Sequence, residues 1–588
     1  MSDVVTEPAT RSSVVRVLRH EWTVATVGSV LLAIVMVWLL PPYASRLVTG
    51  GVKQETIADP VHTIIGDTGD PPAQAWLVAW NGQSLRHGLR GWWHTNAFYP
   101  DSFGLAYTDT LFGYAPAGLI GQGVTAAVLR YNVLFVLTFA LAFLGGYAML
   151  RQLGAERVAA ALAGAALAYA PWRYDHAGHL NIMSTGGITL AVAMLARGHG
   201  WSLTRGHRGE RIRPGWAVAG WLVAAWQVSL GFAIGIGFVY LLAVACLCAA
   251  IGWLVRGRPP LGRRLILADL AGGLIFTAVT AFFAYGYRQV RELYPEVARS
   301  WDYVAVFSPT PRGLLVAPQY SLPWGTLHND ARAALGSAAN EKALLCGYAL
   351  YLLALGGLFL SAWSVRQRLL LLAGAVLGIL FALGTNGPTY RFLHLYVPGF
   401  DGSRTPGRLI LWPTICLAVL AAGLLTELAR AARAATLPQW QTIAVRVLTI
   451  PPLLLVLAEG MPDMDHPDTP VAPAAFAMAS APVMVLPSDE GVDTNVLLWS
   501  TDGFPLMVNG SSGFNPPNHQ ALRDLMQTFP SEPSLERLRR LAVRCVVVVR
   551  DRVHGTPYEA VLQAPTPPGV IRQDIGPDVL YTITPVTT

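Results

Sequence analysis

Charged side chains are scarce in this sequence. Asp, Glu, Lys and Arg make up only 13% of its 588 residues, whereas hydrophobic residues make up 53% and the mean hydropathy is +0.43. Because soluble domains carry roughly 25% charged residues, this composition excludes an ordinary soluble protein. It predicts an integral membrane protein, in which the positions of Arg and Lys are more informative than the formal net charge of +7.

Cysteine and the common nucleotide and zinc motifs are also lacking. The sequence has five cysteines, of which Cys545 stands alone near the C-terminus and the others lie in apolar runs: Cys246, Cys248, Cys346 and Cys416. This spacing fits neither a zinc site nor a disulfide framework. No GxxxxGK loop, no GxGxxG after a strand and no His-Glu-x-x-His pair is present. The sequence therefore gives no support to ATP-driven transport or a soluble-type hydrolase, and we expect no nucleic-acid partner.

Long apolar runs dominate the first three quarters of the chain. The run Trp22–Leu40 follows Arg11, Arg16 and Arg19 and precedes no small-residue cleavage site, so we interpret it as a retained membrane anchor. Runs of roughly 15 to 25 apolar residues predict membrane-spanning helices. Ten more runs of this kind follow: Tyr131–Leu150, Val158–Pro171, Ile182–Ala196, Trp216–Leu230, Phe232–Val255, Leu265–Tyr287, Ala343–Val365, Leu369–Leu383, Leu409–Leu425 and Val447–Ala458.

The distribution of arginine predicts the topology. The piece Leu111–Leu129 is moderately apolar and fits either a further span or a helix lying on the membrane surface. If it lies on the surface, every short basic loop falls on the side of the N-terminus, as the positive-inside rule requires. We therefore predict an α-helical polytopic protein of the cytoplasmic membrane with about eleven transmembrane helices. Its N-terminus is then cytoplasmic and its C-terminal region lies outside.

Three parts follow from this topology: a cytoplasmic segment 1–21, a membrane module 22–459 and an extracytoplasmic soluble domain 460–588. The membrane module contains a long first outer loop, at about 42–131. The last part alternates short buried-strand patterns with helical ones, which predicts a small α/β domain. Its expected strands are Pro482–Pro487, Val543–Val549 and Val579–Ile583, and its expected helices are Asn518–Thr528 and Ser534–Ala542.

Two carboxylates mark the first outer loop. Asp67 and Asp70 stand among glycines just before Pro71 and Pro72, where the plain interpretation is a turn with solvated or capping aspartates. The loop is unusually aromatic beyond them, which favours an interface or a binding wall over a plain connector. Because Pro71 biases Asp70 towards an extended, rigid backbone, we favour Asp70 as a catalytic base. Asp67 then supports it or binds a metal.

Further polar candidates stand in other loops on the same predicted side. Arg173, His176 and His179 follow a short span, and the two His share a face if the segment is helical. They fit a divalent metal site, contacts to a phosphate or a sugar hydroxyl, or a hydrogen-bonded interface cluster. Arg404 and Arg408 match the geometry of a phosphate or are snorkelling anchors. Glu341, at the entrance of a span, is a candidate for substrate contact or for structural pairing.

Several sequence blocks resemble a family of bacterial membrane proteins described as GT-C-type glycosyltransferases. The blocks are GDTGDPPAQAWLVAW, NAFYPDSFGLAYTDTLFG, APWRYDHAGHLNIMS, VPGFDGSRTPGRL and PLMVNGSSGF. The resemblance implies a polyprenyl-phosphate sugar donor and an acidic residue in the first outer loop as base or acceptor-positioning group. That residue maps onto Asp67 or Asp70. Asp109 stands where relatives carry an acidic residue before the next helix.

The chemistry of that class suits these residues. A carboxylate takes the acceptor proton, cations or a metal stabilise the departing phosphate, and an apolar groove holds the lipid. We therefore expect an inverting-type transferase that moves a sugar from undecaprenyl or decaprenyl phosphate to a glycan or lipid-linked acceptor of the cell envelope. A divalent metal ion stays open as cofactor, with Asp67, His176 and His179 as candidate ligands. The alternatives are a lipid or glycan transporter or flippase, which typically carries polar groups at mid-membrane, and a non-catalytic assembly protein.

Overall fold

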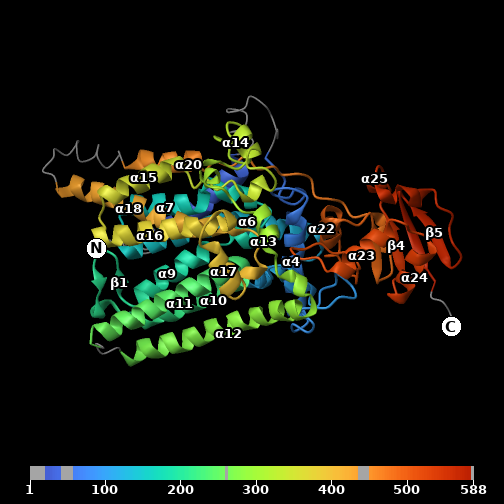
Figure 1. The fold of residues 1–588 in the computed structure, drawn as a ribbon, viewed down its shortest axis with the longest axis horizontal. Coiled ribbons are helices and arrows are strands. Elements are labelled where there is room, and N and C mark those ends of the chain that lie inside the picture. The colour runs from blue at the N-terminus through green and yellow to red at the C-terminus, as the bar shows by residue number, and fades with distance from the viewer. Residues whose placement is uncertain (1–19, 41–56, 258–261, 435–448, 585–588) are drawn as a thin grey trace, which may run out of the picture.

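The computed structural model describes residues 20–40, 57–257, 262–434 and 449–584. Arg11, Arg16 and Arg19 and the start of the first outer loop lie outside these ranges. Within them the protein is mostly helical, with small sheets. Figure 1 shows long helices running side by side and the C-terminal part beyond one end of them.

The apolar runs form helices close to the expected places. They are α2 (Glu21–Ile34), α6 (Gly123–Leu153), α7 (Arg157–Tyr169), α9 (Gly186–Gly198), α10 (Pro214–Leu230), α11 (Phe232–Val255), α12 (Arg263–Leu293), α15 (Tyr348–Phe359), α16 (Val365–Ala382), α18 (Leu411–Ala434) and α20 (Ile450–Glu459). Among the described residues, seven helical segments are long and apolar enough to cross a membrane, whereas α7, α15 and α20 are shorter apolar helices. The finer count of about eleven spans stays a prediction.

The outer helices expose apolar side chains that water would not tolerate. Leu274 on α12 is 71% exposed and Phe359 on α15 is 80% exposed. Contiguous apolar surface of this kind needs lipid or protein to cover it. The inner helices α6, α9 and α18 are instead largely buried by their neighbours. Helices α6 and α9 approach closely because Gly145 faces Gly186, where an added Cβ would lie 2.4 Å from the Gly186 carbonyl oxygen.

The piece Leu111–Leu129 is neither a span nor a single surface helix. It divides into a 3-10 turn (Phe112–Tyr114), the four-residue helix α5 (Ala115–Gly118) and the first residues of α6. Gly121 and Gly123 adopt positive φ angles of 71° and 79°, a conformation that interrupts a helix. The first outer loop therefore ends at Gly123, where α6 begins, and α4 (Asp70–Arg86) is its longest helix.

The C-terminal part contains a four-stranded sheet in the order β3-β4-β6-β5. Strand β3 (Val483–Leu486) is parallel to β4 (Cys545–Val548), and β6 (Asp578–Ile583) pairs antiparallel with β4 and with β5 (Val570–Ile575). The helices of this part are α22 (Glu490–Trp499), α23 (Pro517–Met526) and α24 (Glu532–Arg540). Strand β5 and helix α22 were not expected from the sequence.

The first outer loop and the C-terminal part are joined by backbone hydrogen bonds. The N–H of Met507 donates to Asn96 O over 2.8 Å, and the N–H of Phe98 donates to Asn509 O over 3.1 Å. Helix α22 packs against α4. These contacts place the segment after Asn509 at the end of the long helices where the candidate site lies.

Candidate active site

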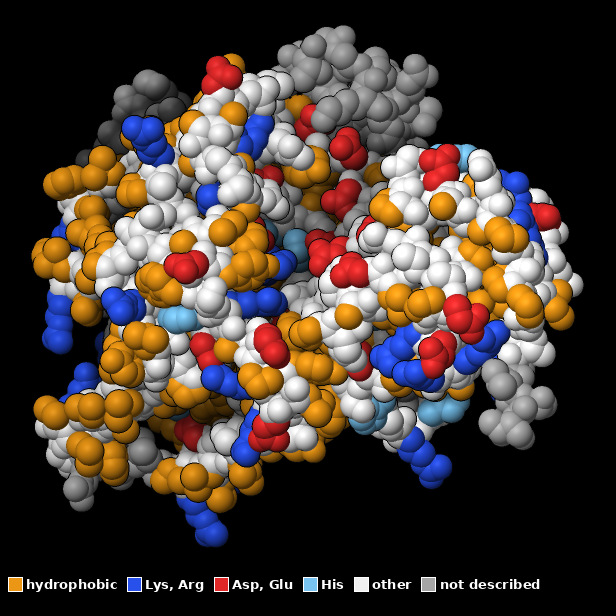
Figure 2. Space-filling model, turned by 45° about the vertical axis from the view of Figure 1, so that its right-hand side comes forward, with side chains coloured by type: hydrophobic (Ala, Val, Ile, Leu, Met, Phe, Trp, Pro, Cys, Tyr) orange, Lys and Arg blue, Asp and Glu red, His pale blue; other side chains and the backbone are white. Residues whose placement is uncertain are grey.

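A cavity of about 1320 Å³, here called the main cavity, lies where the helices, the first outer loop and the C-terminal part meet. Figure 2 shows a hollow in this region with acidic side chains around it. Asp67, Asp70, Asp109, His179, Arg404 and Arg408 all line the main cavity. The fold thus brings together residues that stand up to 341 positions apart in the sequence, from Asp67 to Arg408.

Asp70 and His179 form a polar pair on the wall of the main cavity. His179 Nε2 lies 3.1 Å from Asp70 Oδ2, and the two side chains are 23% and 57% exposed. Asp70 is the first residue of helix α4, so the extended backbone expected before Pro71 is wrong. Proline fits the first turn of a helix because the N–H groups there have no helical partner, and Pro71 and Pro72 therefore continue the helix that Asp70 begins.

Asp67 lies beside this pair in the turn before α4. Its Oδ1 accepts a hydrogen bond of 2.7 Å from the N–H of Gly69. Burial raises the pKa of Asp67, and the neighbouring Asp70 carboxylate raises it further against the lowering effect of that hydrogen bond. Asp67 consequently holds a proton more readily than an ordinary Asp.

His176 does not line the main cavity. Its ring centroid is 6.1 Å from that of His179, and its Nδ1 lies 3.8 Å from Glu341 Oε2, too far for a hydrogen bond. Burial lowers the pKa of His176 to about 3, so the imidazole is neutral near pH 7. His176 therefore packs behind the cavity wall rather than in it.

Glu341 pairs with Arg408 instead of facing the main cavity. The guanidinium donates from Nε over 3.2 Å and from Nη2 over 2.5 Å to the two carboxylate oxygens. Burial alone would raise the pKa of Glu341, but the charge of Arg408, its hydrogen bonds and the nearby His176 and His179 together lower this pKa to about 2. Of the two roles left open for Glu341, its position favours structural pairing. Arg408 reaches the cavity with its charge already balanced.

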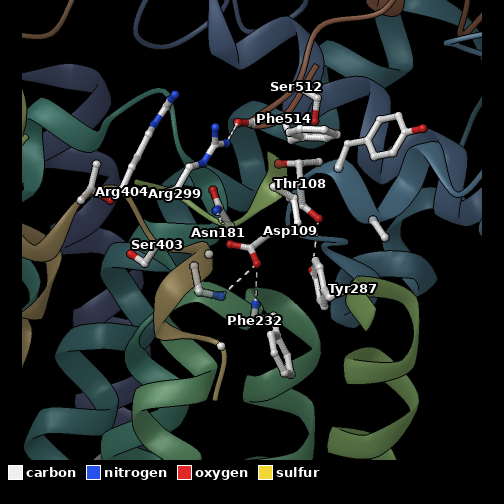
Figure 3. A pocket seen from close by; sticks show the side chains of 18 of the residues that line it. Thr108, Asp109, Asn181, Phe232, Tyr287, Arg299, Ser403, Arg404, Ser512 and Phe514 are labelled. Atoms are coloured by element: carbon white, nitrogen blue, oxygen red, sulfur yellow. Dashed lines mark hydrogen bonds between the residues drawn. The ribbon is translucent and has the colours of Figure 1, made fainter. Parts of the chain in front are cut away.

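Arg299 and Arg404 bring less compensated positive charge to the main cavity. Arg404 Nη1 donates to the Tyr303 hydroxyl over 3.2 Å, and Arg299 Nη2 donates to Gly513 O over 2.6 Å. Among the described residues, neither guanidinium has a carboxylate within ion-pair distance. Burial lowers the pKa of Arg299, and the nearby Arg404 lowers it further. Figure 3 shows both side chains on one side of the pocket.

Asp109 lines the main cavity, but both of its carboxylate oxygens already accept hydrogen bonds from other groups of the protein. Oδ1 accepts from the N–H groups of Phe232 and Ala233 over 2.6 and 3.0 Å, and Oδ2 accepts from Asn181 Nδ2 over 2.6 Å (Figure 3). Asp109 thereby caps the N-terminus of α11, where backbone N–H groups and the helix dipole favour an anion. Its contact with substrate stays a prediction.

Arg173 lies away from the cavity. It is fully buried, and its guanidinium donates to Thr185 Oγ1 over 3.0 Å and to Met183 O over 2.7 Å. The Phe139 ring lies 5.6 Å from the guanidinium carbon. Since these contacts hold Arg173 inside the helical core, its position gives no support to the expected substrate contact.

No group of three or more His, Cys, Asp or Glu side chains within the described ranges is arranged to hold a metal ion. Asp67 and His179 face the main cavity, whereas His176 turns towards Glu341. The three metal candidates therefore do not converge on one point.

The sequence matches no family model and no curated protein. The fold, however, is similar to that of arabinofuranosyltransferase AftD from mycobacteria, solved by cryo-EM, with a TM-score of 0.50 and 16% identity over 96% of this chain. The chain has a GT-C-type fold. It spans 41% of the length of AftD. An archaeal GT-C protein, the oligosaccharyltransferase of Archaeoglobus fulgidus, matches 89% of this chain and 67% of its own at 14% identity and a TM-score of 0.40.

The site also contains residues that were not expected there from the sequence: Arg299, Tyr303 and the segment Ser511–Asn515. All of them line the main cavity. The segment before Phe514 has the composition of a turn: Asn509-Gly510-Ser511-Ser512-Gly513. This composition gives no sign that Gly513 O accepts a hydrogen bond from Arg299. One sequence signal could have indicated Arg299: Tyr303 stands four residues after it, a spacing that lets the tyrosine ring lie against the guanidinium.

Proposed function

We propose that this protein is a membrane glycosyltransferase that moves a sugar from a polyprenyl-phosphate donor to an acceptor hydroxyl. The observation that carries the proposal is the pair of Asp70 and His179 on the wall of a cavity that also holds Arg299 and Arg404. A carboxylate base and phosphate-binding cations within one cavity are what this reaction requires. The GT-C-type fold supports the same class.

Asp70 takes the acceptor proton in this proposal. His179 is neutral near pH 7 because burial lowers its pKa, although the Asp70 carboxylate opposes that effect. A neutral imidazole with its proton on Nε2 donates a hydrogen bond to Asp70 Oδ2 and keeps that proton. The other carboxylate oxygen, Oδ1, is then free to accept the proton of the acceptor hydroxyl. His179 is thus a positioning residue for the base. The tautomer is inferred from the 3.1 Å contact.

Arg299 and Arg404 receive the phosphate. The acceptor oxygen attacks the anomeric carbon as its proton passes to Asp70, and the bond from that carbon to the phosphate oxygen breaks with its electron pair. Polyprenyl phosphate leaves with the negative charge, which the two guanidinium groups stabilise. A single displacement of this kind inverts the anomeric configuration. Arg408 contributes less because Glu341 balances its charge.

The lipid chain lies along the helices. The main cavity is lined on its membrane side by Val239 on α11, Ala284 on α12 and Trp412 on α18. Next to this wall the outer surfaces of α11 and α12 are strongly apolar and exposed. An isoprenoid chain therefore passes from the cavity into lipid without crossing polar surface. The arginine-rich loops predict that the cavity opens on the extracytoplasmic side.

The test is a transfer assay with the purified full chain in lipid nanodiscs. A decaprenyl-phosphate sugar labelled in the sugar is incubated with the protein and cell-envelope extract, and both the glycan product and free decaprenyl phosphate are measured. We expect label in the glycan together with release of decaprenyl phosphate. Movement of intact donor across the bilayer of a liposome, without cleavage, would instead show a flippase.

A further inference from the structure

Two arginines meet at the turn where the first outer loop passes into α6. Arg86 Nη2 donates to Leu119 O over 2.7 Å and to Gly121 O over 3.3 Å. Arg130 Nη1 donates to the same Gly121 O over 3.1 Å and also to Ile120 O. The two guanidinium groups therefore stand side by side, with Arg86 exposed at the surface and Arg130, which is 8% exposed, beneath it.

This pair of positive charges has no carboxylate partner within ion-pair distance among the described residues. Asp and Glu are absent from the sequence at 71–100 and at 110–155, the two stretches that contain Arg86 and Arg130. Two like charges at one turn repel each other, and the burial of Arg130 without a counter-charge is costly. An anion placed against Arg86 would offset both effects.

Helix lengths and aromatic side chains place the pair near the membrane surface. A helix needs about 20 apolar residues to cross the hydrocarbon core, and α6 has 31 residues, so its first turns reach the level of the lipid headgroups. Trp92 and Trp93 follow Arg86 closely in the chain, and their ring centroids lie 5.5 and 5.7 Å from that of Phe282 on α12. Phe282 is 46% exposed on the outer surface of that helix. Tryptophan is enriched at membrane–water interfaces.

An exposed apolar stripe runs along α6 from this turn. Leu129, Val133 and Leu137 are 39%, 49% and 40% exposed, although most of α6 is buried. Because they stand four residues apart, they share one face of the helix. Arg130 stands three positions before Val133, so it lies close to the same face. A lipid chain on this stripe would bring its phosphate to the arginine pair.

We propose that Arg86 and Arg130 form a binding site for an anionic phospholipid, whose phosphate lies against Arg86 and whose acyl chain follows the α6 stripe. A guanidinium presents parallel N–H groups that match two phosphate oxygens. Among the described residues Arg86 uses Nη2 for the turn, which leaves donors on Nε and Nη1 for the lipid. Arg130 adds its charge from below. A zwitterionic headgroup fits less well, because its own cation would be a third positive charge at the turn.

This site is separate from the proposed transfer reaction and does not depend on it. Neither Arg86 nor Arg130 lines the main cavity. A bound phospholipid ties the last residue of α4 and the first turns of α6 to the membrane. Because such a ligand binds the folded state and not the unfolded chain, it should stabilise the fold.

Thermal unfolding of the purified full chain in detergent micelles tests the site. Phosphatidylglycerol added to the micelles should raise the unfolding temperature of the wild type more than an equal amount of phosphatidylcholine does. Arg86→Gln should lose most of this difference between the two lipids. Arg312→Gln, at an exposed position of another loop on the same predicted side, is the matched control and should keep it. Each variant serves as its own reference, so a general loss of stability does not hide the result.

Native mass spectrometry of the same proteins gives the affinities. Arg86→Gln should weaken phosphatidylglycerol binding about tenfold, the scale of a lost hydrogen bond to a charged group. Val133→Asn should also weaken it, whereas Leu241→Asn, at an exposed apolar position on α11, should not. The inference is overturned if the two lipids act alike on the wild type, or if Arg86→Gln keeps the wild-type difference. Inorganic phosphate that stabilises the protein as much as phosphatidylglycerol would show an anion site without a lipid and would also overturn it.

Discussion

The imidazole Nε2 of His179 lies 3.1 Å from Oδ2 of Asp70, although the two residues stand 109 positions apart in the chain. Helix α4 begins at Asp70, and His179 directly precedes the short helix α8 (Leu180–Met183). Two helix starts therefore meet at this contact. Each fixes the backbone of its residue, so the pair is held in place before any substrate arrives.

His179→Ala should lower the turnover number about 10- to 100-fold and leave the KM for donor within twofold. The reason is that His179 orients Asp70 without touching the phosphate. His179→Gln retains an N–H donor and should recover a large part of the lost activity. Steady-state kinetics of the transfer reaction separates the two constants, and a variant that raises KM at unchanged turnover would assign His179 to substrate binding.

Arg404→Ala and Arg299→Ala should each weaken binding of decaprenyl phosphate at least tenfold, because each removes a charge-assisted hydrogen bond to the phosphate. Arg312→Ala, at an exposed position away from the main cavity, is the control. Titration of the purified variants with the lipid, followed by native mass spectrometry, gives the affinities. Unchanged binding in Arg404→Ala would favour the anchoring role of this arginine at the membrane surface.

Asp109→Ala should act on stability rather than on donor recognition. Its two carboxylate oxygens accept three hydrogen bonds from Phe232, Ala233 and Asn181, and removal leaves these donors unpaired at a cost of about 1–3 kcal/mol each. We expect a lower unfolding temperature in nanodiscs and decaprenyl phosphate binding within threefold of wild type below that temperature. Wild-type stability with lost lipid binding would give Asp109 a substrate contact instead.

His176 should make the folded state sensitive to acid. Its pKa is about 3 in the folded protein and 6.5 as the ordinary value, so the unfolded chain binds one proton more between these pH values. Stability is therefore lost as the pH falls below about 6.5, and a full difference of one proton corresponds to roughly 1.4 kcal/mol per pH unit. Glu341, whose pKa is lowered from 4.5 to about 2 in the folded protein, adds to this loss of stability only as the pH falls below about 4.5.

Thermal unfolding at pH 7 and pH 5 measures this effect. His176→Asn should show a smaller drop in unfolding temperature between the two pH values than wild type does, whereas the exposed His87→Asn should show the wild-type drop. An equal drop in His176→Asn and wild type would contradict the assignment of a neutral, buried His176.

Much of the helical framework follows from the sequence because apolar length predicts it directly. The run Phe232–Val255 coincides with α11, and Trp216–Leu230 lies within α10. The structure of Leu111–Leu129 is harder to predict, because its many apolar residues resemble one continuous helix. Gly121 and Gly123, which have positive φ angles, interrupt it between α5 and α6. The strand β5 was missed because Val570–Ile575 is an edge strand with a largely exposed face and polar residues.

The sequence indicates which polar residues are candidates for the site and that they lie on one side of the membrane. It does not indicate which of them are paired with other side chains in the folded protein. Asp67, Asp70, His179 and Arg404 do line one cavity, as their predicted common side implied. Arg173 and Glu341 differ because their partners, Met183 and Thr185 for the first and Arg408 for the second, are brought to them only by the tertiary fold. Whether a charge is free or balanced cannot be read from the sequence alone.

The central claim is that Asp70 is the base of a glycosyl transfer, and replacement of this one carboxylate tests it most directly. Labelled sugar transfer from a decaprenyl-phosphate donor is measured for Asp70→Asn and Asp67→Asn, with Asp551→Asn as an exposed control. Loss of a general base lowers turnover by roughly 100-fold or more, so Asp70→Asn should fall by at least that factor while it still binds decaprenyl phosphate. Asp67→Asn should lower turnover by a smaller factor, and Asp551→Asn should leave turnover unchanged. Full activity in Asp70→Asn would contradict the account, and an inactive Asp67→Asn beside it would transfer the role of base to Asp67.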